Sequence, residues 1–408
     1  MRLTGPSPAR LAALGIDDRG EPRPPASSTP ANGGGRRGAP RIALLVLAAG
    51  LAATAGGSVA APLRTVAASS ASSTPPASAS ADDWSELHPA TAPLPRDSAV
   101  VAYDAASQTV VVSGGETGCG PSGREVYQDT WTWDGSQWKQ VSTEAPGVFG
   151  VPNAYDPATG TVDVIWVPSC GDLVTSQWDG QTWTTTESET APGYDQPAPY
   201  SEGAMAYDPT SKTLLLWSPG PGSVPGAASL PNDQPSTWSW DGSTWQPLSP
   251  DISPPSSIGG ETRDVQMVDD AATGQMLLYG DPSQTMWTWD GTNWSQLIAT
   301  GGPSPRVGAS MLYDSALGEV LLFGGVAVTG YTPATATKGE AYTMGGPLND
   351  LWAWSGGGWR QLHPATSPPA RFYAQMAYDA ASGQVLLFGG SVNTIADIAD
   401  TWVYGPAT

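Results

Sequence analysis

Few side chains of this chain could carry out metal chemistry or catalysis. Its two histidines, His88 and His363, both lie in an identical "LHPAT" segment. This repetition explains them better than a shared metal site, which needs several ligands gathered around one ion. Glycoside hydrolysis needs two apposed carboxylates, and the mere presence of 38 acidic residues does not identify such a pair. The sequence therefore assigns no catalytic residue, no metal and no cofactor.

The two cysteines are the other reactive side chains. Cys119 lies in "GETGCGP" and Cys170 in "VPSCGDL", and both follow the second apolar strand of adjacent repeats, which are described below. Equivalent loops of adjacent repeats lie close together, and an exported protein meets an oxidising compartment. We therefore expect a disulfide between Cys119 and Cys170. Two unpaired thiols are the alternative, and the spacing fits no zinc motif.

Charge is distributed unevenly along the chain. Residues 1–81 carry eight arginines and three acidic residues, whereas residues 82–408 carry nine basic and 35 acidic residues. A body this acidic repels phosphate backbones and anionic lipid headgroups. Nucleic acid is therefore not an expected partner.

Three segments precede this acidic body. Residues 1–41 are rich in Pro, Gly, Ser and Arg, a composition that does not order itself. Residues 42–63, from Ile42 to Leu63, carry no charge over 22 residues. That length is enough for a transmembrane helix across a hydrocarbon core of about 30 Å. Residues 64–81 are an Ala/Ser/Pro-rich segment, which predicts a flexible linker.

The basic residues near this apolar segment predict its orientation. Arg36, Arg37 and Arg41 precede it, which favours a cytoplasmic N-terminus and an extracellular body held by a single-pass signal anchor. The alternative is a signal peptide that is cut near the small residues of "SVAA" at 58–61, which would release a secreted protein. Both alternatives export residues 82–408.

The body repeats one pattern at a spacing of about 50 residues, which is typical of propeller blades. Six times an apolar stretch ends in Tyr-Asp, or in one case in Asp-Asp, and is followed by a short turn and a second apolar run. Such a turn between two apolar runs predicts a β-hairpin, here strands a and b. The first residues of these six pairs are Tyr103, Tyr155, Tyr207, Asp269, Tyr313 and Tyr378.

Trp-rich hairpins follow and predict strands c and d. Asp-Gly between aromatic residues is a strong hairpin signal. In the first such hairpin, a two-residue loop would pair Trp131 with Trp138, whereas a four-residue loop would pair Trp133 with Trp138. Five hairpins are complete, but the sixth, at 399–408, ends at strand c. The missing strand d is the "WSEL" that begins at Trp84, which predicts a ring closed by pairing the two ends of the body.

These residues resemble the kelch family of β-propellers. The resemblance covers about residues 82–408 and rests on "LLFGG" at 321–325 and 386–390, "DLWAW", "DTWVY" and the "W…L…PPAR" segment. It is weaker in blades 2, 3 and 4, where other residues replace the Gly pair. It implies an all-β, six-bladed propeller with four antiparallel strands per blade. In kelch-like rings the places of Arg96, Arg306 and Arg371 tend toward inter-blade hydrogen bonds or the ring mouth.

Recognition is expected on the face that bears the b–c loops, because long loops on a rigid scaffold usually carry it. These loops span 116–128, 219–235, 326–349 and 391–399. We predict an extracellular, membrane-tethered binding module for a protein or a glycan. One alternative is an exported sugar-modifying enzyme similar to kelch-type sugar-acid epimerases, with its site at the ring mouth, and the other is a structural spacer. The candidate binding residues are Arg124, Tyr127, Tyr331, Lys338, Glu340 and Tyr342.

Overall fold

The computed structural model describes residues 82–117, 125–166, 174–187, 203–219, 236–255, 265–280, 284–299, 301–332, 341–393 and 396–406. The chain divides into two units, Met1–Ser58 and Val59–Thr408, and all of the described residues belong to the second. Within these ranges no helix has the length and apolar character needed to cross a membrane. The predicted tail at 1–41, transmembrane segment at 42–63 and linker at 64–81 lie outside the described residues.

The described part of the chain contains six four-stranded antiparallel sheets, which we number 1 to 6 along the chain. Sheets 1, 2 and 3 consist of β2 (Val100–Asp104), β3 (Thr109–Ser113), β4 (Thr130–Trp133), β5 (Trp138–Ser142); β6 (Asn153–Asp156), β7 (Thr161–Trp166), β8 (Val174–Trp178), β9 (Trp183–Glu187); and β10 (Ala204–Asp208), β11 (Thr213–Ser218), β12 (Ser236–Trp240), β13 (Trp245–Leu248). Sheets 4, 5 and 6 consist of β14 (Val265–Asp270), β15 (Gln275–Gly280), β16 (Thr285–Trp289), β17 (Trp294–Leu297); β19 (Ser310–Asp314), β20 (Glu319–Phe323), β23 (Leu351–Trp354), β24 (Trp359–Leu362); and β25 (Gln375–Asp379), β26 (Gln384–Phe388), β29 (Thr401–Gly405), β1 (Asp83–Leu87).

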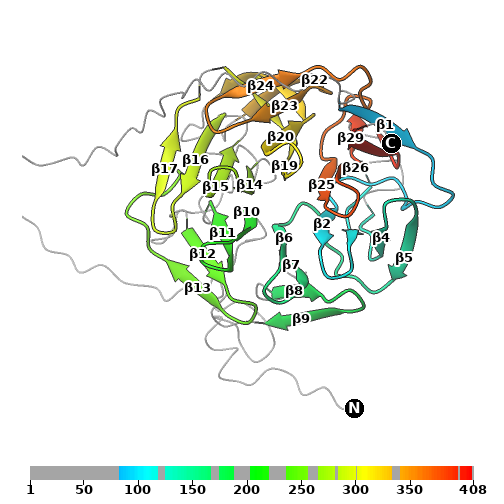
Figure 1. Ribbon diagram of the computed structural model, residues 1–408, viewed down its shortest axis with the longest axis horizontal. Helices are drawn as coiled ribbons and strands as arrows, with labels where there is room; N and C mark the ends of the chain where they lie inside the picture. The colour runs from blue at the N-terminus through cyan, green and yellow to red at the C-terminus, as the bar shows by residue number, and fades with distance from the viewer. Residues whose placement is uncertain are drawn as a thin grey trace, which may run out of the picture. The chain divides into compact units, whose positions relative to one another are not determined.

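The first strand of each sheet faces a common centre (Figure 1). These strands contact one another in a closed order, from β2 through β6, β10, β14, β19 and β25 back to β2. The Trp-bearing fourth strands lie at the outside. This radial arrangement of small antiparallel sheets is that of a β-propeller.

The two ends of the body meet in sheet 6. Strand β1 pairs antiparallel with β29, and Trp84 lies opposite Tyr404. The indole of Trp84 also packs against the rings of Tyr404 and Phe323, at centroid distances of 5.2 and 5.3 Å. The prediction that the N-terminal "WSEL" supplies the missing fourth strand is confirmed. Because β1 covers the edge of β29, that strand is not left with an open edge where the two ends of the body meet.

The Trp hairpins use the longer of the two predicted loops. Trp133 pairs with Trp138 across four loop residues, and the carboxylate of Asp134 accepts hydrogen bonds from the backbone N–H groups of Ser136 and Gln137. Equivalent Trp pairs occur in sheets 2 to 5. In all five pairs the ring centroids lie 5.1 to 5.7 Å apart. The rings in each pair are tilted relative to one another, and cross-strand aromatic pairs of this kind stabilise each hairpin beyond the burial of the rings.

The core lies between adjacent sheets. In β3, Val110, Val111 and Val112 are all fully buried, because sheets cover this strand on both faces. That two-sided burial explains the unbroken apolar run in the sequence. One core cluster joins Val110 and Trp138 of sheet 1 to Phe388 of sheet 6. Each sheet is therefore stabilised by its two neighbours.

Two smaller sheets complete the described fold. Strands β18 (Arg306–Val307), β21 (Val326–Thr332) and β22 (Ala341–Pro347) form a three-stranded sheet, and β27 (Ser391–Asn393) pairs with β28 (Ala396–Asp397). Strands β21, β22, β27 and β28 lie in b–c connections for which the sequence predicts only long loops, whereas β18 lies in the connection between sheets 4 and 5. The three-stranded sheet contains register shifts, and it forms because β18 of the preceding connection pairs with β21.

Candidate functional site

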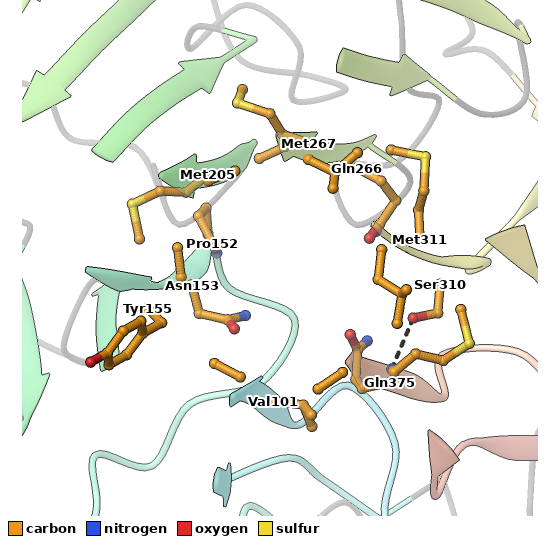
Figure 2. A pocket seen from close by; sticks show the side chains of 18 of the residues that line it. Val101, Pro152, Asn153, Tyr155, Met205, Gln266, Met267, Ser310, Met311 and Gln375 are labelled. Atoms are coloured by element: carbon orange, nitrogen blue, oxygen red, sulfur yellow. Dashed lines mark hydrogen bonds between the residues drawn. The ribbon is translucent and has the colours of Figure 1, made fainter. Parts of the chain in front are cut away.

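A cavity of about 560 Å³ lies among the first strands of all six sheets (Figure 2). Its size falls within the range of small-molecule sites. The lining comes from β2, β6, β10, β14, β19 and β25 and from the segments that precede them. Because each of these strands is held in place by its own sheet, the cavity is formed by the fold itself.

Three side-chain amides point into this cavity from different sheets, those of Asn153, Gln266 and Gln375 (Figure 2). The Asn153 amide nitrogen donates to the carbonyl of Val151 at 3.0 Å. Gln266 and Gln375 make no side-chain hydrogen bond with the described residues. Each of these carboxamides carries both donors and acceptors that suit a polar ligand.

Asp269 is the one carboxylate among the described residues that line the cavity. Its Oδ1 atom is buried and has no hydrogen-bond partner in the described part of the chain. Burial, together with the negative charges of Asp208 and Asp270, raises the pKa of the Asp269 carboxyl to about 6. At neutral pH the site therefore holds a negative charge that no cation among the described lining residues balances.

Tyrosine occupies the place of Asp269 in the other five sheets. Burial is the main reason that the pKa values of Tyr103 and Tyr155 are raised. The second reason is the negative charge of an aspartate in the a–b turn of the preceding sheet, which is Asp379 for Tyr103 and Asp104 for Tyr155. Each of these tyrosines therefore lies against its neighbour's turn. Figure 2 shows Tyr155 beside its strand rather than across the cavity. The repeat thus places a neutral phenol at this position in five sheets and a carboxylate in one.

The aspartates that follow these positions hold the a–b turns through hydrogen bonds to the backbone. Asp104 Oδ1 accepts a hydrogen bond from the backbone N–H of Ala106 at 2.9 Å. Asp156, Asp208, Asp314 and Asp379 make the same bond two residues on, at 2.8 to 3.0 Å. They fix the a–b turns and are not available to a ligand.

The cavity has no source of positive charge among its described lining residues, which include no Lys, Arg or His. Within the described ranges no group of three or more His, Cys, Asp and Glu side chains could hold a metal ion. His88 and His363 are both exposed, and the His88 side chain is 80% accessible. The electrostatics of the cavity favour a neutral or cationic ligand over an anionic one.

The three arginines lie inside their own sheets and not at the cavity. Each guanidinium pairs through two nitrogens with an aspartate, at 2.6 to 3.0 Å, and donates to the carbonyl of the first glycine of a Gly pair. All three side chains are fully buried. The inter-sheet hydrogen bond that the kelch resemblance implied is made by the backbone instead, for example from Gly390 N–H to the Arg96 carbonyl at 2.9 Å. The three units are Arg96–Asp129–Gly114, Arg306–Asp350–Gly324 and Arg371–Asp400–Gly389.

The structure describes only part of the predicted loop face. Tyr127 is half-buried, with the Arg96 guanidinium 4.1 Å from its ring centre, and its hydroxyl donates to the carbonyl of Pro95. The backbones of Tyr331 and Tyr342 pair across β21 and β22, so these two positions lie together. The predicted binding residues Arg124, Lys338 and Glu340 and the predicted disulfide Cys119–Cys170 lie outside the described residues.

Sequence reasoning noted Asp269 as the exception in the Tyr series but gave it no role. The available signal was that departure from the repeat. The amides of Asn153, Gln266 and Gln375 carried no signal of a shared site. Gln266 and Gln375 lie three residues before the first residue of their pairs and Asn153 lies two before its own, and nothing in the sequence shows that these places face one cavity.

Comparisons with known proteins bear on the fold. No family model matches this chain, and no curated protein matches it in sequence. The solved structure of YjhT matches with a TM-score of 0.53 at 13% sequence identity, covering 77% of this chain and 95% of that chain. Similarity at this identity shows the fold alone. Together with the radial sheets, it shows that the described part of the chain forms a β-propeller.

Proposed function

We propose that this protein is a membrane-tethered binding module whose kelch-like, six-bladed propeller recognises a protein or glycan outside the cell. The six four-stranded sheets in closed order support six blades. The buried Arg, the Gly pair and the Asp-x-Trp segment of sheets 1, 5 and 6 support the kelch resemblance. The propeller is a rigid scaffold on which loops can present a binding surface.

The observation that carries this proposal is the three-stranded sheet of β18, β21 and β22. Two of its strands, β21 and β22, lie in the longest b–c connection, and they form a sheet separate from the four strands of sheet 5. Residues 343–346 of β22 are exposed, and Met344 is 48% accessible. β22 is also the last strand in the sheet order, so its outer edge is unpaired among the described strands. An exposed strand edge with an apolar side chain is suited to binding an extended partner segment.

Loop shortening tests this proposal. We expect the full chain to bind members of a panel of glycans and cell-surface proteins. Replacing residues 328–345 by a short Gly-containing turn should abolish that binding, because it removes most of β21 and β22. Thermal unfolding should show an intact propeller in the variant. Equal binding by the shortened variant would overturn the assignment of the site to this loop.

The membrane tether is part of the same proposal and rests on the apolar residues 42–63 and the arginines before them. Protease added to intact cells should remove the propeller from the cell surface. The mass of the mature chain separates an anchor from a signal peptide cut near residue 61. The same mass measurement, with and without a thiol-alkylating reagent, tests the proposed disulfide between Cys119 and Cys170.

The enzyme alternative has one observation in its favour, the half-buried Asp269 with a raised pKa. A sugar-acid substrate, however, needs a cationic partner for its carboxylate, and the described cavity lining has none. Its single charge would repel such a substrate. We therefore favour binding over sugar-acid epimerisation.

A further inference from the structure

The carboxylate of Asp269 is unusual because the repeat does not need it. Five sheets have tyrosine at this place, so the fold is satisfied by a neutral side chain there. The aspartate instead places a charge close to Asp208 and Asp270 and leaves its buried Oδ1 without a partner in the described residues. Such an arrangement destabilises the folded state. A destabilising polar group in a cavity is typical of a ligand-binding position.

The charge of the cavity restricts the ligand. Asp269 is the only carboxylate and no Lys, Arg or His is present among the described lining residues. A ligand ammonium group would supply the missing counter-charge, whereas a carboxylate or phosphate would be repelled. The ligand is therefore expected to be a cation.

The three side-chain amides indicate which uncharged polar groups the ligand carries. Asn153, Gln266 and Gln375 come from sheets 2, 4 and 6 and point toward the same space (Figure 2). Carboxamides both donate and accept hydrogen bonds, which matches hydroxyl groups. Two of the three have no partner in the described part of the chain. The aliphatic side chains of Val101 and Val268, which also line the cavity, provide apolar contacts for the carbon skeleton.

We propose that the central cavity binds an amino sugar, with the ligand ammonium group paired to the carboxylate of Asp269 and its hydroxyls bound by Asn153, Gln266 and Gln375. The volume of about 560 Å³ accommodates a monosaccharide with ordered water or a disaccharide. This site is distinct from the loop face and goes beyond the binding function proposed for it.

Three sugars that differ in charge provide the test. Glucosamine, glucose and glucuronate would be titrated into the purified full chain by calorimetry at neutral pH. Glucosamine should bind about tenfold more tightly than glucose, a factor that corresponds to ~1.4 kcal/mol. Glucuronate should bind more weakly than either. Absence of binding by all three, or no preference for glucosamine, would overturn the proposal.

Substitutions test whether the preference for glucosamine over glucose comes from the carboxylate of Asp269. Asp269→Asn should reduce glucosamine affinity about tenfold, to the level of glucose, and leave glucose affinity unchanged. Asp269→Tyr introduces the residue that five sheets already carry, so it should fold and also lose the preference. Asp290→Asn is the matched control, because Asp290 is an exposed turn carboxylate of the same sheet. A preference that survives Asp269→Asn would contradict the proposal.

Two further variants test the hydroxyl contacts and the independence of the site. Gln266→Leu should lower the affinity for glucosamine and the affinity for glucose by the same factor, because it removes hydrogen bonds that both sugars make. The variant with a shortened 328–345 loop should retain glucosamine binding while losing its protein or glycan partner. Loss of glucosamine binding in that variant would contradict a separate site in the cavity.

Discussion

The six sheets share one strand order but fall into two groups. Sheets 1, 5 and 6 contain a buried arginine that is paired with an aspartate, and sheets 2, 3 and 4 do not have an arginine at this place. In sheet 6, Arg371 is fully buried and pairs with Asp400, which also accepts a hydrogen bond from the Trp402 indole at 2.8 Å. Sheets 1 and 5 repeat this unit. In sheet 3 a serine replaces the aspartate, and Ser236 still accepts from the Trp238 indole at 2.9 Å.

Two kinds of hydrogen bond join neighbouring sheets, and they are distributed differently. Backbone bonds from the second glycine of a Gly pair link sheets 5 to 6, 6 to 1 and 1 to 2, namely Gly325 N–H to Arg371 O, Gly390 N–H to Arg96 O and Gly115 N–H to Val148 O. Indole bonds to threonine link sheets 1 to 6, 2 to 1, 3 to 2 and 4 to 3, namely Trp138 to Thr401, Trp183 to Thr130, Trp245 to Thr175 and Trp294 to Thr237. Two further indoles donate to other acceptors, Trp240 to Asp163 between sheets 3 and 2 and Trp359 to the sulfur of Met286 between sheets 5 and 4. Indole bonds also join sheets 2 and 3 and sheets 3 and 4 within the described part of the chain.

At the interfaces of sheet 2 with 3 and of sheet 3 with 4, the described residues include the indole bonds. At the interface of sheets 5 and 6 the reverse holds. The Trp84 indole N–H has no partner among the described residues, and the backbone bond from Gly325 is present. Each of these three interfaces therefore retains one of the two systems.

The largest effect is expected from breaking a buried ion pair. Asp400→Ala would leave the fully buried guanidinium of Arg371 without its partner, and the free energy of unfolding should fall by about 3–5 kcal/mol. Arg360→Gln is the control, because Arg360 and Glu319 form a pair of similar length, 2.7 Å, with a 59% exposed Arg side chain. Its loss should cost less than about 1 kcal/mol. Equal effects in urea unfolding would contradict the distinction.

The next effect comes from a buried carboxylate in sheet 2 that has no arginine. Asp163 accepts hydrogen bonds from the Trp240 indole, the Thr161 hydroxyl and the Gln177 amide, and burial raises its pKa to about 6. Between pH 3.8, the ordinary pKa of an aspartate, and about pH 6, the Asp163 carboxyl is protonated in the folded protein but ionised in the unfolded chain. This contribution to stability is therefore present below pH 4 and is lost as the pH rises through 6, by about 3 kcal/mol.

Asp163→Asn should accordingly raise the free energy of unfolding by up to about 3 kcal/mol at pH 7 and change it little at pH 4. The carboxyls of Asp129 and Asp350 behave oppositely. The charge and hydrogen bonds of their arginines outweigh burial and hold their pKa below the usual value, so acid should weaken sheets 1 and 5. A pH-independent effect of Asp163→Asn would refute this contrast.

A smaller effect is expected at the glycines. Gly389 has a φ of +71°, and a Cβ there would lie 2.6 Å from the Arg96 carbonyl oxygen. Gly389→Ala should therefore cost about 2 kcal/mol or more. Gly274 in sheet 4 has a similar φ of +68° but no atom within 4 Å of such a Cβ. Gly274→Ala should cost only about 1 kcal/mol, and equal losses in thermal unfolding would show that the close approach is unimportant.

The smallest effect concerns the indole bonds. Thr401→Val removes the acceptor of the buried Trp138 N–H, which is 2.9 Å away, and should cost about 1 kcal/mol. The fold tolerates buried indole N–H groups without a partner among the described residues, namely those of Trp84, Trp178, Trp217 and Trp287. In a double-mutant cycle with Trp138→Phe, the two losses should be less than additive. Full additivity would mean that the hydrogen bond contributes nothing.

The sequence predicted the strands and their order because the signals are local and repeated. The Tyr-Asp turns, the Asp-Gly hairpins and the apolar runs each depend on a few neighbouring residues. The pairing of Trp84 with the last strand followed from counting strands across the repeats. The competing loop lengths in the Trp hairpin could not be separated, since both place aromatic residues opposite Trp138.

Other features depend on non-local contacts. The pairing of β21 with Arg306–Val307 requires two connections to meet in space, and the Gly- and Thr-rich segment carries little strand signal. The partners of Arg96, Arg306 and Arg371 lie 29 to 44 residues away. Asp269 is conspicuous in the repeat, yet its lack of a partner is visible only in three dimensions.

The most direct test of the proposed recognition surface is a binding measurement on two matched variants. Met344 and Leu317 are exposed apolar residues of the sheet 5 repeat, the first on β22 and the second in an a–b turn at the opposite end. On cells that display the full chain, Met344→Asp should abolish binding to the panel of glycans and surface proteins, and Leu317→Asp should leave it unchanged. Binding that survives Met344→Asp but not Leu317→Asp would contradict the account.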